Sequence, residues 1–360
     1  MLASVERRLR QLLRAVSSPG ESRRDVWLTT VIALTLTVGV VVVIFAALGV
    51  NPGSGLRSVI DGSLGNRFAF GQTVSITTLL ILTGLAAAIP FSARLWNIGG
   101  EGQLYFGAFA AAAIALTMPV DTPPWLFVGL SVIAGVVGGI FWGLIPGILK
   151  AAADANEMIV SLMSVFIAIL VANYAITDLW PEGFKPATED IPPGGRLPRI
   201  WEGTLVDAGA LLAVFAVVVG WVIMSRMRLG FEIRAIGLNS QTARMNGISP
   251  QRGAVGAFGL GGGFAGLAGA IAVLGLNGAL VDNFSRNFGF IGIAVALVAR
   301  LNPVWIIPSA LFFSILRVGT NSLPAKTGLD PSMGEILVAT FVILLLASRV
   351  IRLRYAEAAT

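Results

Sequence analysis

Residues 253–274 read GAVGAFGLGGGFAGLAGAIAVL, an uncharged run of apolar and small residues. A hydrocarbon layer ~30 Å thick is crossed by ~20 such residues in a helix, so this stretch predicts a transmembrane helix. Two pairs of its glycines, Gly259/Gly263 and Gly262/Gly266, are spaced one helical turn apart. Because small residues at this spacing let two helices approach closely, we expect this helix to pack against others.

The composition of the whole chain is that of a membrane protein. Mean hydropathy is +0.84 and 12% of the residues are charged, whereas soluble domains carry roughly 25% charged residues. The apolar runs are continuous rather than alternating, which favours helices over the strands of a membrane barrel. The chain has no Cys and no His, which excludes disulfides, thiol or imidazole catalysis and the usual zinc sites. We expect no catalytic residues and no metal site.

The pattern of apolar runs predicts an all-α polytopic membrane fold with about ten transmembrane helices. The predicted spans cover residues 26–50, 70–90, 98–118, 124–148, 157–177, 208–225, 253–275, 288–301, 303–319 and 333–348. With the N-terminus and the C-terminus both inside, most Lys and Arg residues fall on cytoplasmic segments or span ends, as the positive-inside rule requires. The shortest predicted span, 288–301, is the one on which this count depends.

Polar segments flank and interrupt the single transmembrane domain, residues 26–349. Residues 1–25 carry six Arg among regularly spaced apolar residues, which predicts a cytoplasmic amphipathic helix on the inner leaflet. Residues 178–207 are rich in proline, so they predict an external loop that cannot form a long helix. Residues 226–252 predict a basic cytoplasmic loop, and residues 350–360 a cytoplasmic tail.

Two short sequences recur about half a chain apart. GLAAAI at residues 84–89 resembles GLAGAI at residues 266–271. The separation covers an odd number of predicted spans, which turns the second copy upside down in the membrane. We therefore predict two inverted repeats, at approximately residues 70–177 and 253–348, with a solute pathway between them.

A polar sequence, NIGGEGQ, interrupts the apolar pattern at residues 97–103. One interpretation is structural: Asn97 caps the following helix and Glu101 stabilises the positive end of its dipole. The other is functional: the helix is broken inside the membrane and its polar groups face a solute. Asn277, a lone polar residue near another span end, fits an interhelical hydrogen bond as well as a solute contact. The candidate pathway residues are Asn97, Glu101, Gln103 and Asn277.

The basic run at residues 226–252 contains five Arg and one Glu. Its charge has a simple explanation, because cytoplasmic loops of membrane proteins are basic. It is also suited to holding a partner in the aqueous phase. No Lys in the chain follows a Gly, so the phosphate-binding sequence G-x-x-x-x-G-K-S/T is absent. Any ATP hydrolysis of that type must take place on another polypeptide, and we expect this chain itself to bind no cofactor.

Four motifs together carry a family resemblance. They are NIGGEGQLYFGAFAAA at 97–112, KAAADANEMIVSLM at 150–163, LGFEIRAIGLNSQTARMNGIS at 229–249 and GFIGIAVALVARLNP at 289–303. In this order they resemble the permease subunits of bacterial ABC importers for nucleosides and simple sugars, in the branched-chain amino acid/ribose permease superfamily. The resemblance runs from about residue 70 to 345. It implies a second permease subunit, a cytoplasmic ABC ATPase that uses ATP, and an external solute-binding protein or lipoprotein as partners.

In that family, the loop before the seventh span docks on the ATPase. The loop here resembles a degenerate E-A-A-x-x-x-G pattern, of which Ala243 and Gly247 match, while Gln241 and Thr242 replace the first two residues. By this resemblance the expected ATPase-coupling residues are Arg234, Gly237, Asn239, Ala243, Arg244 and Gly247.

The resulting hypothesis is a permease subunit, not an enzyme, that translocates nucleosides across a bacterial inner or plasma membrane. Membrane lipid is its surroundings, and no nucleic acid is expected as a partner. A ribose-like sugar is the alternative cargo. A stand-alone secondary carrier is a second alternative, although few acids lie within the predicted spans to bind a coupling ion. An intramembrane enzyme is a third, although no catalytic arrangement stands out in the spans.

Overall fold

The computed structural model describes residues 51–183 and 185–321, with a few single positions on either side. Four sequence predictions fall outside these ranges. They are the spans at 26–50 and 333–348, the basic segment at 1–25 and the tail at 350–360.

Internal contacts divide the chain into two units, of which the larger is Asn66–Ser314. The other unit contains α3 (Pro52–Leu64), a helix that the sequence reasoning missed. Proline at its first position suits a helix start. The Asn51 side chain caps α3 by accepting a hydrogen bond from the Gly53 amide at 2.9 Å.

The larger unit is built from helices, and its described residues form isolated β-bridges but no β-strand. Its helices are α4 (Arg67–Ser92), α5 (Gly100–Thr117), α6 (Pro124–Ala153), α7 (Glu157–Tyr174), α8 (Gly209–Arg226), α9 (Arg228–Leu238), α10 (Ser240–Met245), α11 (Pro250–Ile271), α12 (Phe288–Val298) and α13 (Pro303–Thr320), the last of which continues into the other unit. Helix α7 continues as a π-helical turn, Ala175–Leu179, and α11 as another, Ala272–Asn277.

Six helices within the described ranges are long and apolar enough to cross a membrane. They are α4, α6, α8 and α13, together with α7 and α11, each of which is extended by its π-helical turn. Each overlaps one predicted span. The predicted spans at 98–118 and 288–301 correspond to α5 and α12, which are not among the six. Helix α5 starts with polar residues, and α12 has only 11 residues. The all-helical membrane fold is therefore confirmed for the described residues.

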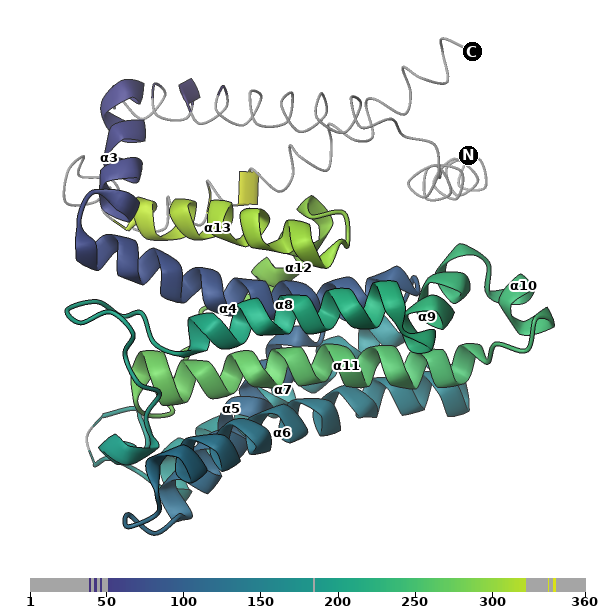
Figure 1. Ribbon diagram of the computed structural model, residues 1–360, viewed down its shortest axis with the longest axis horizontal. Helices are drawn as coiled ribbons and strands as arrows, with labels where there is room; N and C mark the ends of the chain where they lie inside the picture. Colours follow the sequence, from purple (N-terminus) through teal and green to yellow (C-terminus); the bar gives the residue numbers. More distant parts are fainter. Residues whose placement is uncertain are drawn as a thin grey trace. The chain divides into compact units, whose positions relative to one another are not determined.

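The core of the larger unit is formed by α4 and α11. In each of them 89% of the most apolar window is buried, against 33–39% in α6, α7 and α8. Figure 1 shows α11 running between α4 and α8 on one side and α6 on the other. The glycines of α11 make this possible, because a Cβ added at Gly266 would overlap the backbone of Gly135 and Gly139 in α6. The close helix packing expected from the glycine spacing is present.

The packing of α6 on α11 gives a testable prediction. A methyl group at Gly139 would overlap the Gly262 carbonyl oxygen and the Gly266 Cα, so Gly139→Ala should destabilise the protein by about 1–3 kcal/mol through overpacking. Gly129 lies on the same helix with nothing within 4 Å of an added Cβ, so Gly129→Ala is the matched control. Thermal unfolding in detergent should show a lower Tm for Gly139→Ala alone. Equal Tm values for the two variants would contradict this packing.

Candidate functional site

Two helices of the larger unit begin inside it rather than at its ends. Helix α5 crosses the second half of α11, because an added Cβ at Gly107 would overlap Gly266 and one at Gly269 would overlap the backbone of Leu104 and Ala108. Glu101, at the start of α5, contacts Gly289 in the first turn of α12, and Gly292 contacts Thr83 in the interior of α4. Both helices therefore start beside the interior of α4 rather than at its ends. Helix α12 has 11 residues, which at 1.5 Å per residue is roughly half of a ~30 Å hydrocarbon layer. Helix α12 is therefore a half-helix by length, whereas α5, with 18 residues, is about 27 Å long. We call the place where the first turns of these two helices meet the half-helix junction.

The segment that leads into α5 is held by a pair of buried side-chain amides. Asn97 and Gln103 are each 1% exposed, and they exchange two hydrogen bonds of 3.0 and 3.2 Å. The side-chain Oδ1 atom of Asn97 also accepts from the Gly99 amide at 3.1 Å. Ser161 of α7 accepts from the Ile98 amide at 3.2 Å. These polar groups are thus paired within the chain and stabilise a break in the helical backbone.

Glu101 lies where the first turns of α5 and α12 meet. Its side chain is buried, with 3% exposure, and its Oε2 atom accepts a hydrogen bond from the Gly289 amide at 2.6 Å. The approach is so close that a Cβ added at Gly289 would overlap the Glu101 backbone. A carboxylate in this position is stabilised by the positive ends of two helix dipoles.

Aromatic packing and a second close backbone approach extend this junction. Tyr105, one turn after Glu101, packs its ring at 4.7 Å from the ring of Phe284, which lies before α12. A turn further into α12, a Cβ added at Gly292 would overlap Thr83 of α4. The sequence reasoning missed these contacts at the junction, although the spacing of Gly289 and Gly292 signalled a helix face in close contact.

The remaining candidate pathway residue lies elsewhere. Asn277 is exposed and is the last residue of the π-helical turn that continues α11. The structure therefore brings Asn97, Glu101 and Gln103 together and leaves Asn277 apart from them.

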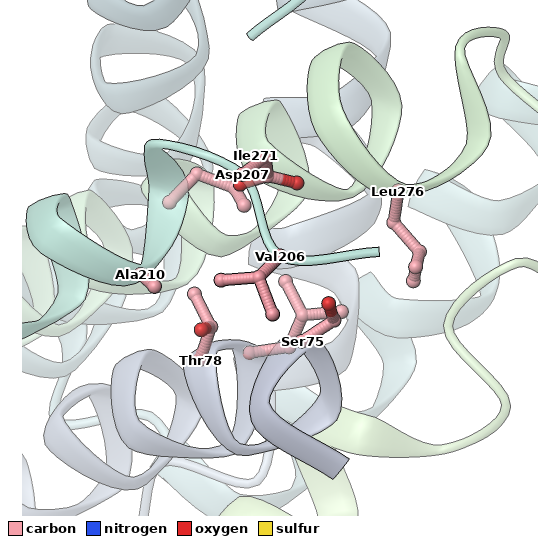
Figure 2. Close-up of a pocket in the computed structure, with 8 residues that line it drawn as sticks. Ser75, Thr78, Val206, Asp207, Ala210, Ile271 and Leu276 are labelled. Carbon is pink, nitrogen blue, oxygen red and sulfur yellow. The ribbon is translucent and has the colours of Figure 1, made fainter. Parts of the chain in front are cut away.

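A small cavity lies where the chain enters α8 (Figure 2). Its volume of about 10 Å³ is enough for one water molecule. Ser75 and Thr78 point from α4 toward Val206, and Asp207 lies beside Ile271 at the end of α11. The lining is completed by Leu79, Ala210 and Leu276. No feature of the sequence pointed to this site, because Asp207 belongs to a loop that holds several other acids.

Asp207 is a buried acid with an unusual proton affinity. It is 5% exposed, and burial raises the pKa of its carboxyl group from 3.8 to about 6. A hydrogen bond from the Gly209 amide, 2.7 Å from Oδ1, and the charge of Arg199 lower the pKa and offset part of that increase. Part of the Asp207 population is therefore protonated near neutral pH.

Helices α9 and α10 occupy the basic run predicted to be a docking loop. The Asn239 side chain caps α10 by accepting from the Gln241 and Thr242 amides at 3.0 and 3.1 Å. Gly237 is buried, because α9 packs so closely on the end of α4 that a Cβ there would overlap the Ser92 carbonyl oxygen. Gly237 is thus enclosed by the packing of α9 on α4, whereas Asn239 is exposed and shapes the start of α10.

The outward face of this segment combines positive charge with apolar side chains. Arg234 and Arg244 are exposed, whereas Ala243 is 4% exposed. Gly247 ends the segment with a φ of +79°, a conformation that favours glycine. The sequence reasoning missed Met245, which is 82% exposed. An exposed methionine beside arginine has the composition of an interface centre.

Apolar helices long enough to span a membrane, a core of two central spans and an exposed basic segment define a multi-pass membrane protein. Residues 69–347 match the family of branched-chain amino acid transport system permease components. The chain belongs to this family and is a permease, that is, a transport component rather than an enzyme.

Curated relatives carry similar descriptions. A glucose ABC transporter permease of Haloferax volcanii is 33% identical, over 91% of this chain and 90% of its own length. A guanosine ABC transporter permease of Bacillus subtilis is 31% identical, over 90% and 94%. A nucleoside ABC transporter permease of Lactococcus lactis is 31% identical, over 83% and 85%.

The raised pKa of Asp207 predicts how stability depends on pH. The buried arrangement favours the protonated acid, so its contribution is largest below the ordinary pKa of 3.8 and is lost as pH rises through about 6. A shift of this size corresponds to about 3 kcal/mol. The Tm in detergent should fall between pH 4 and pH 6.5, and Asp207→Asn should make the fall smaller. Glu202→Gln, at an exposed acid of the same loop, should retain the wild-type profile. An unchanged profile for Asp207→Asn would show that this acid does not titrate as described.

Proposed function

We propose that this chain is the solute-translocating subunit of an ATP-driven nucleoside importer. The observation that carries the proposal is the junction of α5 and α12, where the first turns of the two helices meet around buried polar groups and the aromatic rings of Tyr105 and Phe284. An uncharged nucleoside needs hydrogen-bonding groups beside an apolar or aromatic surface along its route. The names of the guanosine and nucleoside relatives favour the same cargo.

Glucose or another simple sugar is the second candidate cargo. The observation in its favour is the relative from Haloferax volcanii, which is named a glucose permease and is 33% identical. The polar groups of the junction suit sugar hydroxyls as well as a ribose, whereas the Tyr105–Phe284 pair favours a solute with an aromatic base.

The wider architecture proposed here has ten spans, both termini inside, and two inverted repeats. Two features support the repeats. The predicted counterparts α4 and α11 are the two central helices, each with 89% of its apolar window buried. The next counterparts, α5 and α12, both start inside the larger unit, and they meet at their first turns. In this arrangement the 178–207 loop is external and faces a solute-binding protein.

The energy source lies on other subunits. The sequence has no phosphate-binding loop of the G-x-x-x-x-G-K-S/T type, so ATP is assigned to a cytoplasmic ABC ATPase and no cofactor to this chain. A second permease subunit completes the pathway. The α9–α10 segment is assigned to the ATPase interface, with Arg234 and Arg244 as its charged contacts and Met245 as an apolar one.

A movement of this segment would reach both central helices. Helix α9 packs against the end of α4 at Gly237 and against the start of α11, where an added Cβ at Gly253 would overlap Ile236. Helix α10 is joined to α11 by a short turn that ends at Ser249, whose side chain caps α11. A displacement of α10 by the ATPase would therefore be transmitted to α4 and α11 together, and through them to the half-helix junction.

Reconstitution tests the function directly. Vesicles that contain this chain with its cognate ATPase, second permease and binding protein should accumulate radiolabelled guanosine only when ATP is supplied. Vesicles that contain this chain alone should accumulate none. Competition by unlabelled glucose or ribose distinguishes the second cargo. ATP-independent uptake by the isolated chain would overturn the importer assignment in favour of a secondary carrier.

Charge reversal tests the coupling interface. The double substitution Arg234→Glu, Arg244→Glu should weaken association with the ATPase by about tenfold or more, because like charges repel across an interface. Lys185→Glu is the control, since Lys185 is an exposed cation on the 178–207 loop. Co-purification and titration of the ATPase measure the effect. Unchanged association of the double variant, with normal membrane insertion, would place the ATPase elsewhere.

A further inference from the structure

The first turn of α12 has a particular need for hydrogen-bond acceptors. The first amides of any helix lack partners within it, and in a hydrocarbon layer water does not supply them. Asn287, the residue at the cap position, has a left-handed backbone with φ of 69° and forms no capping hydrogen bond with its side chain. Ser285 accepts from the Phe288 amide at 3.2 Å. The next amide, at Gly289, donates its hydrogen bond to Glu101, which belongs to α5.

From this geometry, we propose that Glu101 is a positioning residue that caps α12 in trans and so fixes the first turns of α5 and α12 to each other. It acts as the acceptor that α12 lacks at its own cap position. The proposal rests on the proposed function, because α5 and α12 are taken to border the solute route. It assigns Glu101 to holding that route in shape rather than to touching the solute.

The chemistry of the side chain fits this role. Burying a carboxylate is costly unless hydrogen bonds and charges compensate it. Glu101 is in the first turn of α5 and accepts from the first turn of α12, so the positive ends of both helices lie at its carboxylate. A hydrogen bond to a charged group is roughly twice as strong as one between neutral groups. One carboxylate can therefore hold both helix ends.

The surroundings restrict α12 to this position. Gly289 leaves no room for a side chain, because an added Cβ would overlap the Glu101 backbone. Before α12, Asn283, Arg286 and Asn287 have positive φ values of 50°, 45° and 69°, a conformation unfavourable for residues other than glycine. Such a backbone persists where its surroundings hold it. The contact of Phe284 with Tyr105 and the bond to Glu101 both do so.

Hydrogen–deuterium exchange of the full-length protein in nanodiscs tests the cap without requiring transport. Glu101→Ala should speed exchange of the peptide covering residues 283–292 by about tenfold or more, because it removes a charge-assisted hydrogen bond. Glu101→Gln keeps an acceptor oxygen and should recover most of the protection. Glu157→Gln is the control, since Glu157 is also an acid in the first turn of a helix but pairs with Lys150. Slow exchange in α6 shows that each variant is folded.

Uptake kinetics in the reconstituted importer separate positioning from solute contact. Glu101→Ala should lower the maximal rate by about tenfold while KM stays within about threefold, and Glu101→Gln should restore most of the rate. The proposal is overturned if exchange at 283–292 is unchanged in Glu101→Ala. It is also overturned if both variants raise KM at an unchanged maximal rate, since Glu101 would then bind solute. If wild-type vesicles accumulate no nucleoside, the proposed function fails, while the exchange experiment still decides the role of Glu101.

Discussion

A backbone amide buried in a membrane protein must find an acceptor within the protein, and the Glu101–Gly289 hydrogen bond meets that requirement at the centre of this fold. Continuous helices such as α6 satisfy their own amides along most of their length. Helices α5 and α12 start inside the helix layer, so their first turns need acceptors from elsewhere. The paired amides of Asn97 and Gln103 hold the chain that enters α5, and Glu101 serves α12. The sequence prediction that Asn97 caps α5 is wrong, because the cap position is Gly99, which has no side-chain capping hydrogen bond, and Asn97 pairs with Gln103 instead.

Glycine makes the rest of the arrangement possible. Gly266 and Gly139 let α6 and α11 touch through their backbones, and Gly237 does the same for α9 and the end of α4. The Gly237 contact joins α9 to α4 through their backbones, and the Ile236 side chain joins α9 to the start of α11 at Gly253. A packed interior has few voids and transmits displacement. A push on α10 would thus move α4 and α11, and the half-helix junction lies against both of them.

The sequence predicted the helices of the described region well, because a span of about twenty apolar residues is a local signal. It located the polar break at residues 97–103 and the basic segment at residues 226–252 for the same reason. It could not predict the partner of Glu101, which lies 188 residues away along the chain. It also missed the burial of Asp207, since that depends on α4 and α11 covering the entrance to α8. Met245 is an ordinary residue in sequence and becomes distinctive only through its 82% exposure. The roles of the pathway and coupling residues stay predictions.

An experimental structure of the protein in a lipid nanodisc tests the half-helix arrangement most directly. The quantity to measure is the distance from the Glu101 carboxylate to the Gly289 amide, together with the depth of both groups in the bilayer density. We expect a hydrogen bond within the hydrocarbon layer, with α5 and α12 both starting there. An α12 that starts at the membrane surface, or a Glu101 carboxylate that faces a water-filled route, would contradict the account.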